Sequence, residues 1–220
     1  MKSREKNFSR KCDKKLVLII GCLLFLIENL IGASIRSDIS NSEIVKVKDY
    51  IPNIYIDLKY ATEDNFTKKK IYDFDEAYLR YGTVKKLMVV QRSLSDEGYS
   101  LKIWDAYRPI EAQFELWEAA NHDSRFVVNP NRSYSPHSHG NTVDITLVTI
   151  DGEEIDMPTE FDTFTEKADR NYSDLTPEQR KNALILENAM KKLGFQGYSR
   201  EWWHYKDSTN YPVIRNFKLN

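Results

Sequence analysis

The pattern of hydrophobic and polar positions predicts a domain that contains both strands and helices. Strands are expected where apolar and polar residues alternate, or where a short apolar run is bounded by turn residues. These segments are 53–58, 101–104, 143–148 and 199–206. Helices are expected where apolar residues recur every three or four positions, at 83–94, 111–120 and 177–193. No internal repeat or linker interrupts residues 40–220, so we expect a single domain there.

The helix at 177–193 has the clearest boundaries. Thr176 suits the N-cap, Pro177 suits the first helical position, and Gln179 completes a capping box with Thr176. Gly194 follows the last apolar position and ends the helix. Its apolar stripe is expected to be core and not a cofactor site. The stripe consists of Leu186, Ala189, Met190 and Leu193.

The first 34 residues differ from the rest of the chain. Residues 1–15 carry seven Lys and Arg against two acidic residues, residues 16–27 carry no charge, and 32–34 are small. This order is typical of a secretory signal, and the apolar run is short for a membrane span of roughly 20 residues. We expect a signal peptide or N-terminal membrane anchor at 1–34, with a buried N-terminal helix as the alternative. Residues 35–49 are then a leading segment and 50–220 the functional domain.

Composition narrows the function classes. Hydrophobic residues make up 41% and aromatic residues 12% of the chain, which is ample for a packed core. The formal net charge is −1 and the Lys and Arg residues after the N-terminus are scattered, so we expect no nucleic-acid partner. Membrane association is expected only through the N-terminal segment. Cys12 and Cys22 both lie in that segment, so metal chemistry in the exported chain must use histidine and carboxylate donors.

Three of the four histidines fall in two short clusters, residues 135–144 and 201–204. A catalytic zinc takes three nitrogen, sulfur or oxygen donors and keeps one position for water. We predict a zinc site with His137, Asp144 and His204 as ligands and Glu201 as the base. His139 in place of His137 is an alternative ligand, and a purely structural role for any one histidine is another. The fourth histidine, at 122, is expected to be solvated.

Two geometric conditions follow from the spacing of these residues. His137 and Asp144 are seven residues apart, so a turn at Gly140-Asn141 must fold them together. Glu201 and His204 are three apart, and a regular strand would point them to opposite faces. A twist, a bulge or a departure from the strand must therefore bring both to the metal. Trp202 and Trp203, which lie between them, are expected to wall the site.

An arginine lies at the end of the strand predicted at 101–104. Pro109 forbids ordinary continuation of the strand ladder and biases Arg108 toward extended geometry. A guanidinium fixed there is well placed to stabilise the oxyanion that develops on a scissile carbonyl. The alternative is an ion pair at the surface, with Asp105 or another neighbour.

Several motifs together resemble the D-alanyl-D-alanine dipeptidases of the VanX type, zinc D,D-peptidases of family M15. The two main motifs are Ser-x-His-x-x-Gly-x-x-x-Asp at 135–144 and Glu-Trp-Trp-His at 201–204. Further matching segments, in the same order as in the family, are Asp-Leu-Lys-Tyr-Ala-Thr at 57–62, Asn-Phe at 65–66, Trp-Asp-Ala-Tyr-Arg-Pro at 104–109 and Phe-Asp at 161–162. The resemblance spans residues 50 to 207, and the motifs in combination are highly specific.

The resemblance implies an α+β fold with an antiparallel sheet and flanking helices, in a catalytic domain at 50–220. It implies one Zn2+ per chain on His137, Asp144 and His204. The residues implied around the metal are Glu201 as base, Arg108 as transition-state stabiliser, Asp162 as receiver of the dipeptide ammonium and Ser135 near the substrate carboxylate. His139 falls at a position that the family does not use for metal. Thr142 departs from the pattern, which usually has alanine there, and adds a hydroxyl beside the metal strand.

The resulting expectation is an exported zinc dipeptidase that cleaves D-alanyl-D-alanine or a closely related D,D-dipeptide. Zinc-bound water, deprotonated by Glu201, would attack the peptide carbonyl, and the same residue would return the proton to the leaving amine. One alternative is a D,D-carboxypeptidase that trims peptidoglycan stems, although Asp162 favours a substrate with a free ammonium group. Another is a non-catalytic, zinc-containing binding module at the cell surface.

Overall fold

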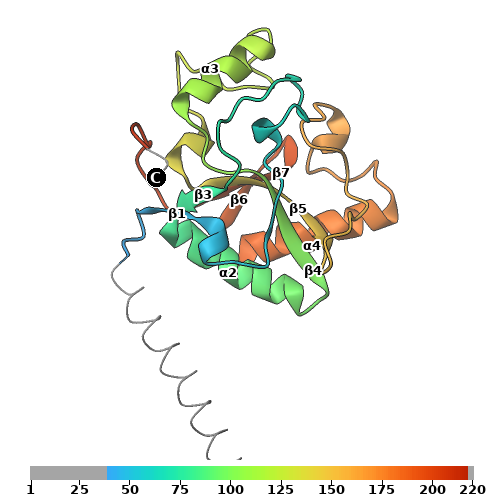
Figure 1. Ribbon diagram of the computed structural model, residues 1–220. Coiled ribbons are helices and arrows are strands. Elements are labelled where there is room, and N and C mark those ends of the chain that lie inside the picture. The colour runs from blue at the N-terminus through green and yellow to red at the C-terminus, as the bar shows by residue number, and fades with distance from the viewer. Residues whose placement is uncertain (1–38, 218–220) are drawn as a thin grey trace, which may run out of the picture. The chain divides into compact units, whose positions relative to one another are not determined.

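The structure is a computed structural model that describes residues 39–217 (Figure 1). The sheet and its helices belong to the compact unit that begins at residue 41. The signal peptide or anchor predicted at 1–34 lies outside the described residues. Between residues 39 and 217, no helix is both long enough and apolar enough to cross a membrane.

A five-stranded sheet forms the centre of this unit, with the strand order β2-β4-β5-β7-β6. The strands are β2 (Tyr55–Ile56), β4 (Tyr99–Asp105), β5 (Thr142–Thr149), β6 (Phe195–Tyr198) and β7 (Glu201–Asp207). Neighbours are antiparallel except β2, which pairs in parallel with β4. The long connection from β2 to β4 allows this crossover, whereas a tight hairpin cannot join parallel strands. The α+β expectation is confirmed, and the sheet is mixed at its β2 edge.

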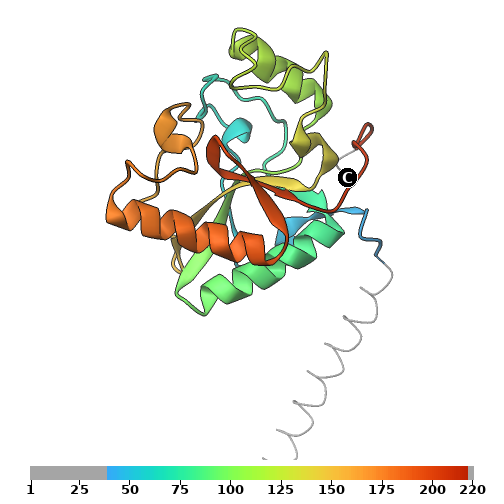
Figure 2. The same cartoon turned by 180° about the vertical axis from the view of Figure 1, so that it is seen from behind.

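Two helices cover one face of the sheet. They are α2 (Tyr81–Ser95) and α4 (Pro177–Lys192), and the two ribbon views show them side by side beneath the strands (Figures 1 and 2). The third helix, α3 (Ile110–Ala119), lies away from them, beyond the opposite side of the sheet. All three helices expected from the sequence are therefore confirmed. The capping box of Thr176 and Gln179 is present at the start of α4.

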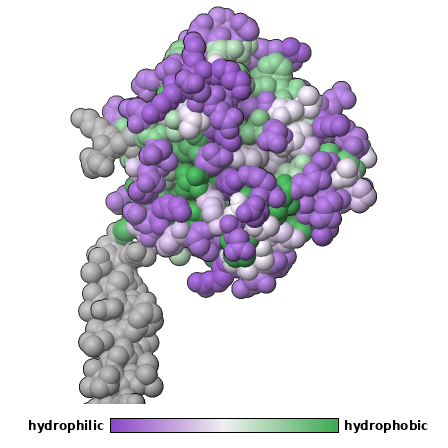
Figure 3. All heavy atoms as spheres, turned by 45° about the vertical axis from the view of Figure 1, so that its right-hand side comes forward, coloured by the Kyte–Doolittle hydropathy of each residue, from purple (hydrophilic) through white to green (hydrophobic). Residues whose placement is uncertain are grey.

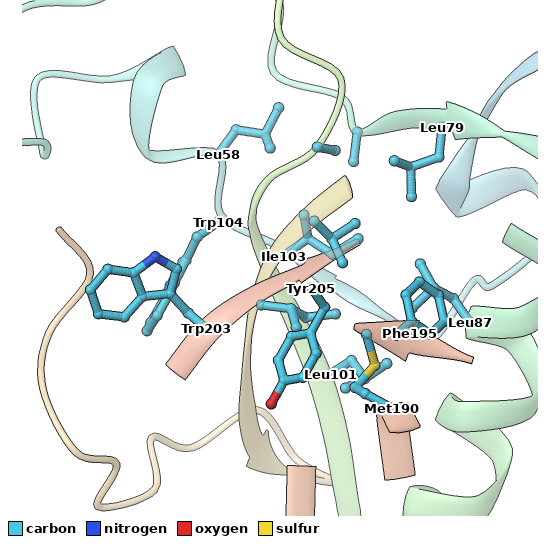
Figure 4. Close-up of a cluster of buried hydrophobic side chains, with 14 of the residues drawn as sticks. Leu58, Leu79, Leu87, Leu101, Ile103, Trp104, Met190, Phe195, Trp203 and Tyr205 are labelled. Atoms are coloured by element: carbon cyan, nitrogen blue, oxygen red, sulfur yellow. The ribbon is translucent and has the colours of Figure 1, made fainter. Parts of the chain in front are cut away.

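Buried apolar side chains pack on both sides of the sheet: Leu87 of α2 and Met190 of α4 belong to this core, and so does Trp203, which lies apart from them in Figure 4. On β5 the alternate residues Val143, Ile145 and Leu147 are fully buried in it. Side chains alternate between the two faces of a strand, so Asp144 and Thr146 point to the other face. Both faces of β5 are covered, which explains why an almost continuously apolar run carries one buried carboxylate.

Two short strands and an arginine tie the beginning and end of the domain together. Strand β1 (Ile44–Lys46) pairs with β3 (Tyr78–Arg80) in a separate antiparallel ribbon. The Arg80 guanidinium donates to the backbone oxygens of Ser42, His139 (3.0 Å) and Pro212 (2.7 Å). These bonds anchor the short 3-10 helix η4 (Pro136–His139) from outside. The face of the domain that Figure 3 shows is mainly hydrophilic, with smaller hydrophobic areas between the polar side chains.

A buried hydroxyl at the start of β5 costs the fold stability. Thr142 is fully buried, and its Oγ1 has no hydrogen-bond partner among the described residues. Thr83, also fully buried, donates through Oγ1 to Asp207 Oδ2 at 2.9 Å. A buried polar group without a partner carries its full desolvation cost, whereas a satisfied one does not.

We therefore expect opposite signs from two matched substitutions. Thr142→Val keeps the shape and removes the unpaired hydroxyl, so it should raise stability by roughly 1 kcal/mol, or about 2–4 °C in Tm. Thr83→Val removes a hydroxyl that donates a hydrogen bond and leaves the buried Asp207 carboxylate with one hydrogen bond fewer. It should therefore lower the free energy of unfolding by about 1–3 kcal/mol. Thermal unfolding of both variants checks this, and a loss of stability in Thr142→Val would contradict it.

Candidate metal and substrate site

The site begins with a row of polar residues across three neighbouring strands. Asp105 at the end of β4 is paired with Asp144 on β5, and Asp144 is paired with His204 on β7. Directly opposed residues on antiparallel strands have Cβ atoms about 5 Å apart and share one face. The register of the sheet therefore brings these three side chains together on the face away from α2 and α4.

The loop before β5 adds the first histidine. Ser135 caps the 3-10 helix η4 by accepting a bond from the backbone N–H of His137 at 3.3 Å. Gly140 closes it in the left-handed region with φ of 73°, which glycine adopts without steric cost. This turn reverses the chain as the spacing required, so that His137 reaches back to Asp144. Its Nε2 lies 3.3 Å from Asp144 Oδ2.

Three donor atoms converge at this point. His204 Nδ1 lies 3.0 Å from Asp144 Oδ1 and 3.4 Å from His137 Nε2. One ligand atom from each of the three residues lies within 4.8 Å of the others. Two of the three side chains are almost fully buried, and His204 is slightly more open. The arrangement is that of a candidate metal site.

The donor chemistry fits zinc. The Nδ1 atom of His137 lies 2.9 Å from the backbone oxygen of Ala106, and a carbonyl oxygen can only accept, so Nδ1 carries the proton. The lone pair of Nε2 is thereby aimed at Asp144 and His204, as in metal sites where a second partner fixes the histidine tautomer. Two imidazole nitrogens and one carboxylate form an ordinary donor set for a catalytic zinc. The described part of the chain supplies no sulfur donor to this site.

Glu201 lies beside the three donors in spite of its three-residue separation from His204. Its Oε2 is 3.6 Å from His204 Nδ1. The bulge that the spacing required is present, because the pairing of β6 with β7 shifts between Gly197 and Tyr198. Burial raises the pKa of the Glu201 carboxyl to about 7. A carboxyl group in this range is suited to exchange protons near neutral pH.

Arg108 is held by a buried carboxylate at the edge of the site. Its Nε and Nη2 donate to Asp105 Oδ2 at 3.0 and 2.6 Å, and its Nη1 donates to Gln113 Oε1 at 2.9 Å. The Tyr72 hydroxyl donates to the other oxygen of Asp105 at 2.8 Å. The ion pair with Asp105 is thus present, but it is buried and lies beside the cavity. The ion pair fixes the position of the Arg108 guanidinium, and Arg108 still lines the cavity.

Asp162 and Ser135 also line the cavity. Asp162 has a left-handed backbone with φ of 53°, a conformation that costs energy in a residue other than glycine. Its Oδ2 accepts a bond from the Tyr60 hydroxyl at 2.8 Å. Burial raises the pKa of the Asp162 carboxyl to about 8, against the bond from Tyr60, which lowers it.

The cavity is small, with a volume of about 200 Å³. This is below the range of roughly 300–1,000 Å³ for pockets that hold drug-sized ligands. Its outer part is aromatic, because Phe164 stacks on Phe126 at 4.6 Å between ring centroids and meets Phe66 edge-on at 5.7 Å. Trp203 forms part of the wall, as expected. Trp202 does not: it is fully buried, and its Nε1 donates to Thr159 Oγ1.

The other two histidines lie outside the donor cluster. His139 Nδ1 lies 2.7 Å from the backbone oxygen of Tyr211 and helps to hold the C-terminal segment. His122 is exposed, as expected, and its Nε2 lies 2.8 Å from Glu118 Oε1. The structure therefore offers His137, and not His139, to the cluster.

Sequence reasoning gave no role to several residues that build the site. Tyr60 was part of a matching motif, and its cation–π contact with Arg108, 5.2 Å from Cζ to the ring centroid, joins two regions of the cavity. Gln113 lies in the first turn of α3, and in the sequence nothing distinguishes it from an ordinary polar residue of a helix. The aromatic rim comes from loops with no shared pattern. Only their position in the fold identifies these side chains.

Comparison with known proteins gives a consistent result. A family model described as D-ala-D-ala dipeptidase matches residues 40–218. A D-alanyl-D-alanine dipeptidase from Escherichia coli (strain K12) is 35% identical, over 79% of this chain and 90% of its own. Proteins of the same name from Enterococcus faecium and Enterococcus faecalis (strain ATCC 700802 / V583) are 33% and 34% identical, each over 68% of this chain and over 83% and 84% of their own.

Similarity to solved structures is weaker. VanYB in complex with D-Alanine-D-Alanine matches with a TM-score of 0.40 and 17% sequence identity, over 60% of this chain and 73% of that chain. A score at this level does not transfer a fold or a ligand. The relationship therefore rests on the sequence matches.

The raised pKa of Asp162 predicts a pH-dependent stability. The folded chain holds this proton up to about pH 8, whereas the unfolded chain releases it near the ordinary value of 3.8. The resulting stabilisation is fully present below the unfolded pKa and is lost as the pH rises through the folded pKa. Asp162→Asn removes this dependence. As the pH rises from about 5 to about 8.5, the Tm of the wild type should therefore fall relative to the Tm of the variant.

Thermal unfolding across this pH range provides the measurement. Asp151→Asn, at an exposed turn residue, is the control and should follow the wild-type curve. Parallel curves for Asp162→Asn and the wild type would show that the Asp162 carboxyl titrates normally.

Proposed function

Because the chain belongs to the D-ala-D-ala dipeptidase family of M15 peptidases, we propose that it hydrolyses D-alanyl-D-alanine to two molecules of D-alanine. The family relationship expected from the motifs is confirmed, and with it the assignment as a metallodipeptidase. The observation that carries the proposal is the convergence of His137, Asp144, His204 and Glu201 at a cavity too small for a long peptide.

We propose that one zinc ion per chain is held by His137 Nε2, Asp144 and His204 Nδ1. When bound, zinc supplies Lewis acidity, which makes water more acidic and polarises a carbonyl oxygen. The chain supports this role with a fixed tautomer at His137, through Ala106, and with a low-dielectric wall at Trp203. Loss of a hydrogen-bond partner of a metal-binding histidine typically lowers metal affinity or activity by about 10- to 100-fold.

Glu201 is the proposed general base. Its pKa, raised by burial to about 7, leaves a substantial fraction ionised at neutral pH. The carboxylate can take the proton of the attacking water and, as the acid, return it to the nitrogen of the leaving D-alanine. One group then serves both halves of the reaction without a second titratable side chain.

Arg108 is proposed to stabilise the oxyanion. Its guanidinium remains charged throughout, and Asp105 and Gln113 fix three of its nitrogen atoms before substrate arrives. Donors that need no reorganisation are worth the most to a developing negative charge. The bonds to Asp105 lower the freedom of the side chain, and Arg108 still lines the cavity.

The two ends of the substrate have different proposed partners. Asp162 would receive the free ammonium, which favours ionisation of this buried carboxyl. Ser135, at the start of the loop that carries His137, would lie near the carboxylate. A substrate blocked at its amino end has no charge to offer to Asp162, and its extra atoms would meet the aromatic rim. These features favour a dipeptide over a peptidoglycan stem.

We also propose that the enzyme is exported, on the pattern of residues 1–34, and acts in peptidoglycan turnover. Dipeptides released outside the cytoplasm would be its natural source of substrate. Any membrane association is proposed only through that N-terminal segment.

Substitution of Glu201 tests the proton-transfer role. Glu201→Gln and Glu201→Ala should both retain zinc, because neither removes a ligand, and should lose about 100- to 10,000-fold in kcat. Metal content by elemental analysis and D-alanine release by the same samples provide the measurement. A variant that is loaded with zinc and turns over normally would remove Glu201 from the mechanism.

A side-by-side substrate assay tests the specificity. The zinc-loaded protein is expected to release D-alanine from D-Ala-D-Ala and to be much slower on N-acetyl-D-Ala-D-Ala. Asp162→Asn should raise KM for the free dipeptide by roughly 10- to 100-fold, the loss expected for one buried charged contact. Preference for the acetylated substrate would indicate a carboxypeptidase. Failure on both by a folded, loaded sample would favour a binding module.

A further inference from the structure

A wide bulge lies where β7 passes the site. Gly197 on β6 is paired with Tyr205, and the next residue, Tyr198, is paired with Glu201. Between these pairs β6 advances by one residue and β7 by four (205 minus 201), so three residues of β7 have no partner on β6. They are Trp202, Trp203 and His204. The bulge separates the proposed base from the proposed ligand and turns both toward the cavity.

The guanidinium of Arg170 fills this bulge. Its Nη2 donates to the backbone oxygens of Trp202 and His204, both at 2.9 Å. Its Nε donates to the backbone oxygen of Tyr198 at 2.8 Å, on the opposite strand. One side chain therefore replaces the ladder bonds that the shifted register removes.

The surroundings of Arg170 fix its position. Its Nη1 donates to Glu187 Oε2 at 3.0 Å, and the same carboxylate oxygen accepts from the Tyr172 hydroxyl at 2.7 Å. Its Cζ lies 4.4 Å from the centroid of the Tyr205 ring. Gly197 provides the space, because a Cβ there would lie 2.4 Å from Cζ of the guanidinium.

The energetics make this contact necessary for the bulge. Backbone carbonyls buried without a partner are costly, and bonds from a charged donor are about twice as strong as neutral ones. Without Arg170, the strand would gain by sliding toward a regular register. A regular register would place Glu201 and His204 on opposite faces of β7.

We propose that Arg170 is a positioning residue for the reaction, which holds Glu201 and His204 on one face of β7 by bonding the backbone of the bulge. The inference rests on the proposed function for these two side chains. Arg170 does not itself line the cavity. It should therefore affect kcat and metal affinity strongly, and KM for the dipeptide little.

Arg170→Met tests this on the full chain. The expected results are a loss of about 10- to 100-fold in zinc affinity, measured by competition with a chromophoric chelator, and a similar loss in kcat. KM should change less than about threefold. In the metal-free protein, hydrogen exchange should accelerate at amides 201–206. Arg170→Lys keeps the charge, but its single nitrogen cannot match the planar set of acceptors, so its values should be intermediate.

The control is Lys86→Met. Lys86 bonds Asp207, the last residue of β7, and Thr209 just beyond it, so its loss should lower Tm while leaving zinc affinity and kcat unchanged. Gly197→Ala is a second, independent test, because its methyl group should displace the guanidinium and reproduce the Arg170→Met pattern. Adding millimolar guanidinium to Arg170→Ala should raise the zinc affinity of this variant at least tenfold. Methylammonium at the same concentration should not.

The outcomes separate the two hypotheses. If Arg170→Met loses only Tm, as Lys86→Met does, with wild-type zinc affinity and exchange rates, the inference is wrong. If Arg170→Met fails to fold, Arg170→Lys and Gly197→Ala decide by the same readouts. If the wild type does not cleave D-Ala-D-Ala, the proposed function fails, and the zinc affinities and exchange rates still decide the role of Arg170.

Discussion

The charge balance of the cavity is the constraint on which the rest of the site depends. The two arginines that line it, Arg108 and Arg125, are each already paired with an aspartate. The carboxyl groups that line it are Asp144, Asp162 and Glu201. Burial raises the pKa of the last two toward neutrality or above, so a positive charge nearby would favour their ionised forms. The site is thus built to bind cations, and a divalent metal and a substrate ammonium are two that the proposed reaction provides.

Strand geometry imposes a second constraint. Residues three apart share a face on a helix but not on a strand. In this domain two of the three proposed ligands come from strands, since Asp144 and His204 are neighbours across β5 and β7. Adding a base three residues before His204 therefore requires a bulge, and a bulge leaves backbone groups that need other partners. The contacts of Arg170 with the oxygens of Trp202 and His204 meet that need.

The sequence predicted the three helices and strands β4, β5 and β7 but not β1, β3 or β6, and the predicted donor residues lie together in the structure. Helices α2, α3 and α4 and strands β4, β5 and β7 carry periodic apolar patterns, and histidine is rare enough for its clustering to be informative. The parallel pairing of β2 was not predictable, because Tyr55–Ile56 is too short to show its direction. Neither was the role of Arg170, because it is set by the shape of a hairpin about 30 residues farther along the chain.

One strained residue and one unsatisfied hydroxyl lie near the site. Asp162 adopts a left-handed conformation, and Thr142 buries a hydroxyl without a partner among the described residues, at the start of the strand that carries Asp144. Each costs stability, and the burial of apolar side chains such as Val143 and Ile145 on the same strand offsets that cost. The two costs differ in kind. The strain at Asp162 accompanies a carboxyl group that is bonded to Tyr60 inside the cavity, where the proposed substrate role requires it, whereas the hydroxyl of Thr142 makes no hydrogen bond among the described residues. A functional site explains the first and not the second, and only the second should be removable without loss of activity.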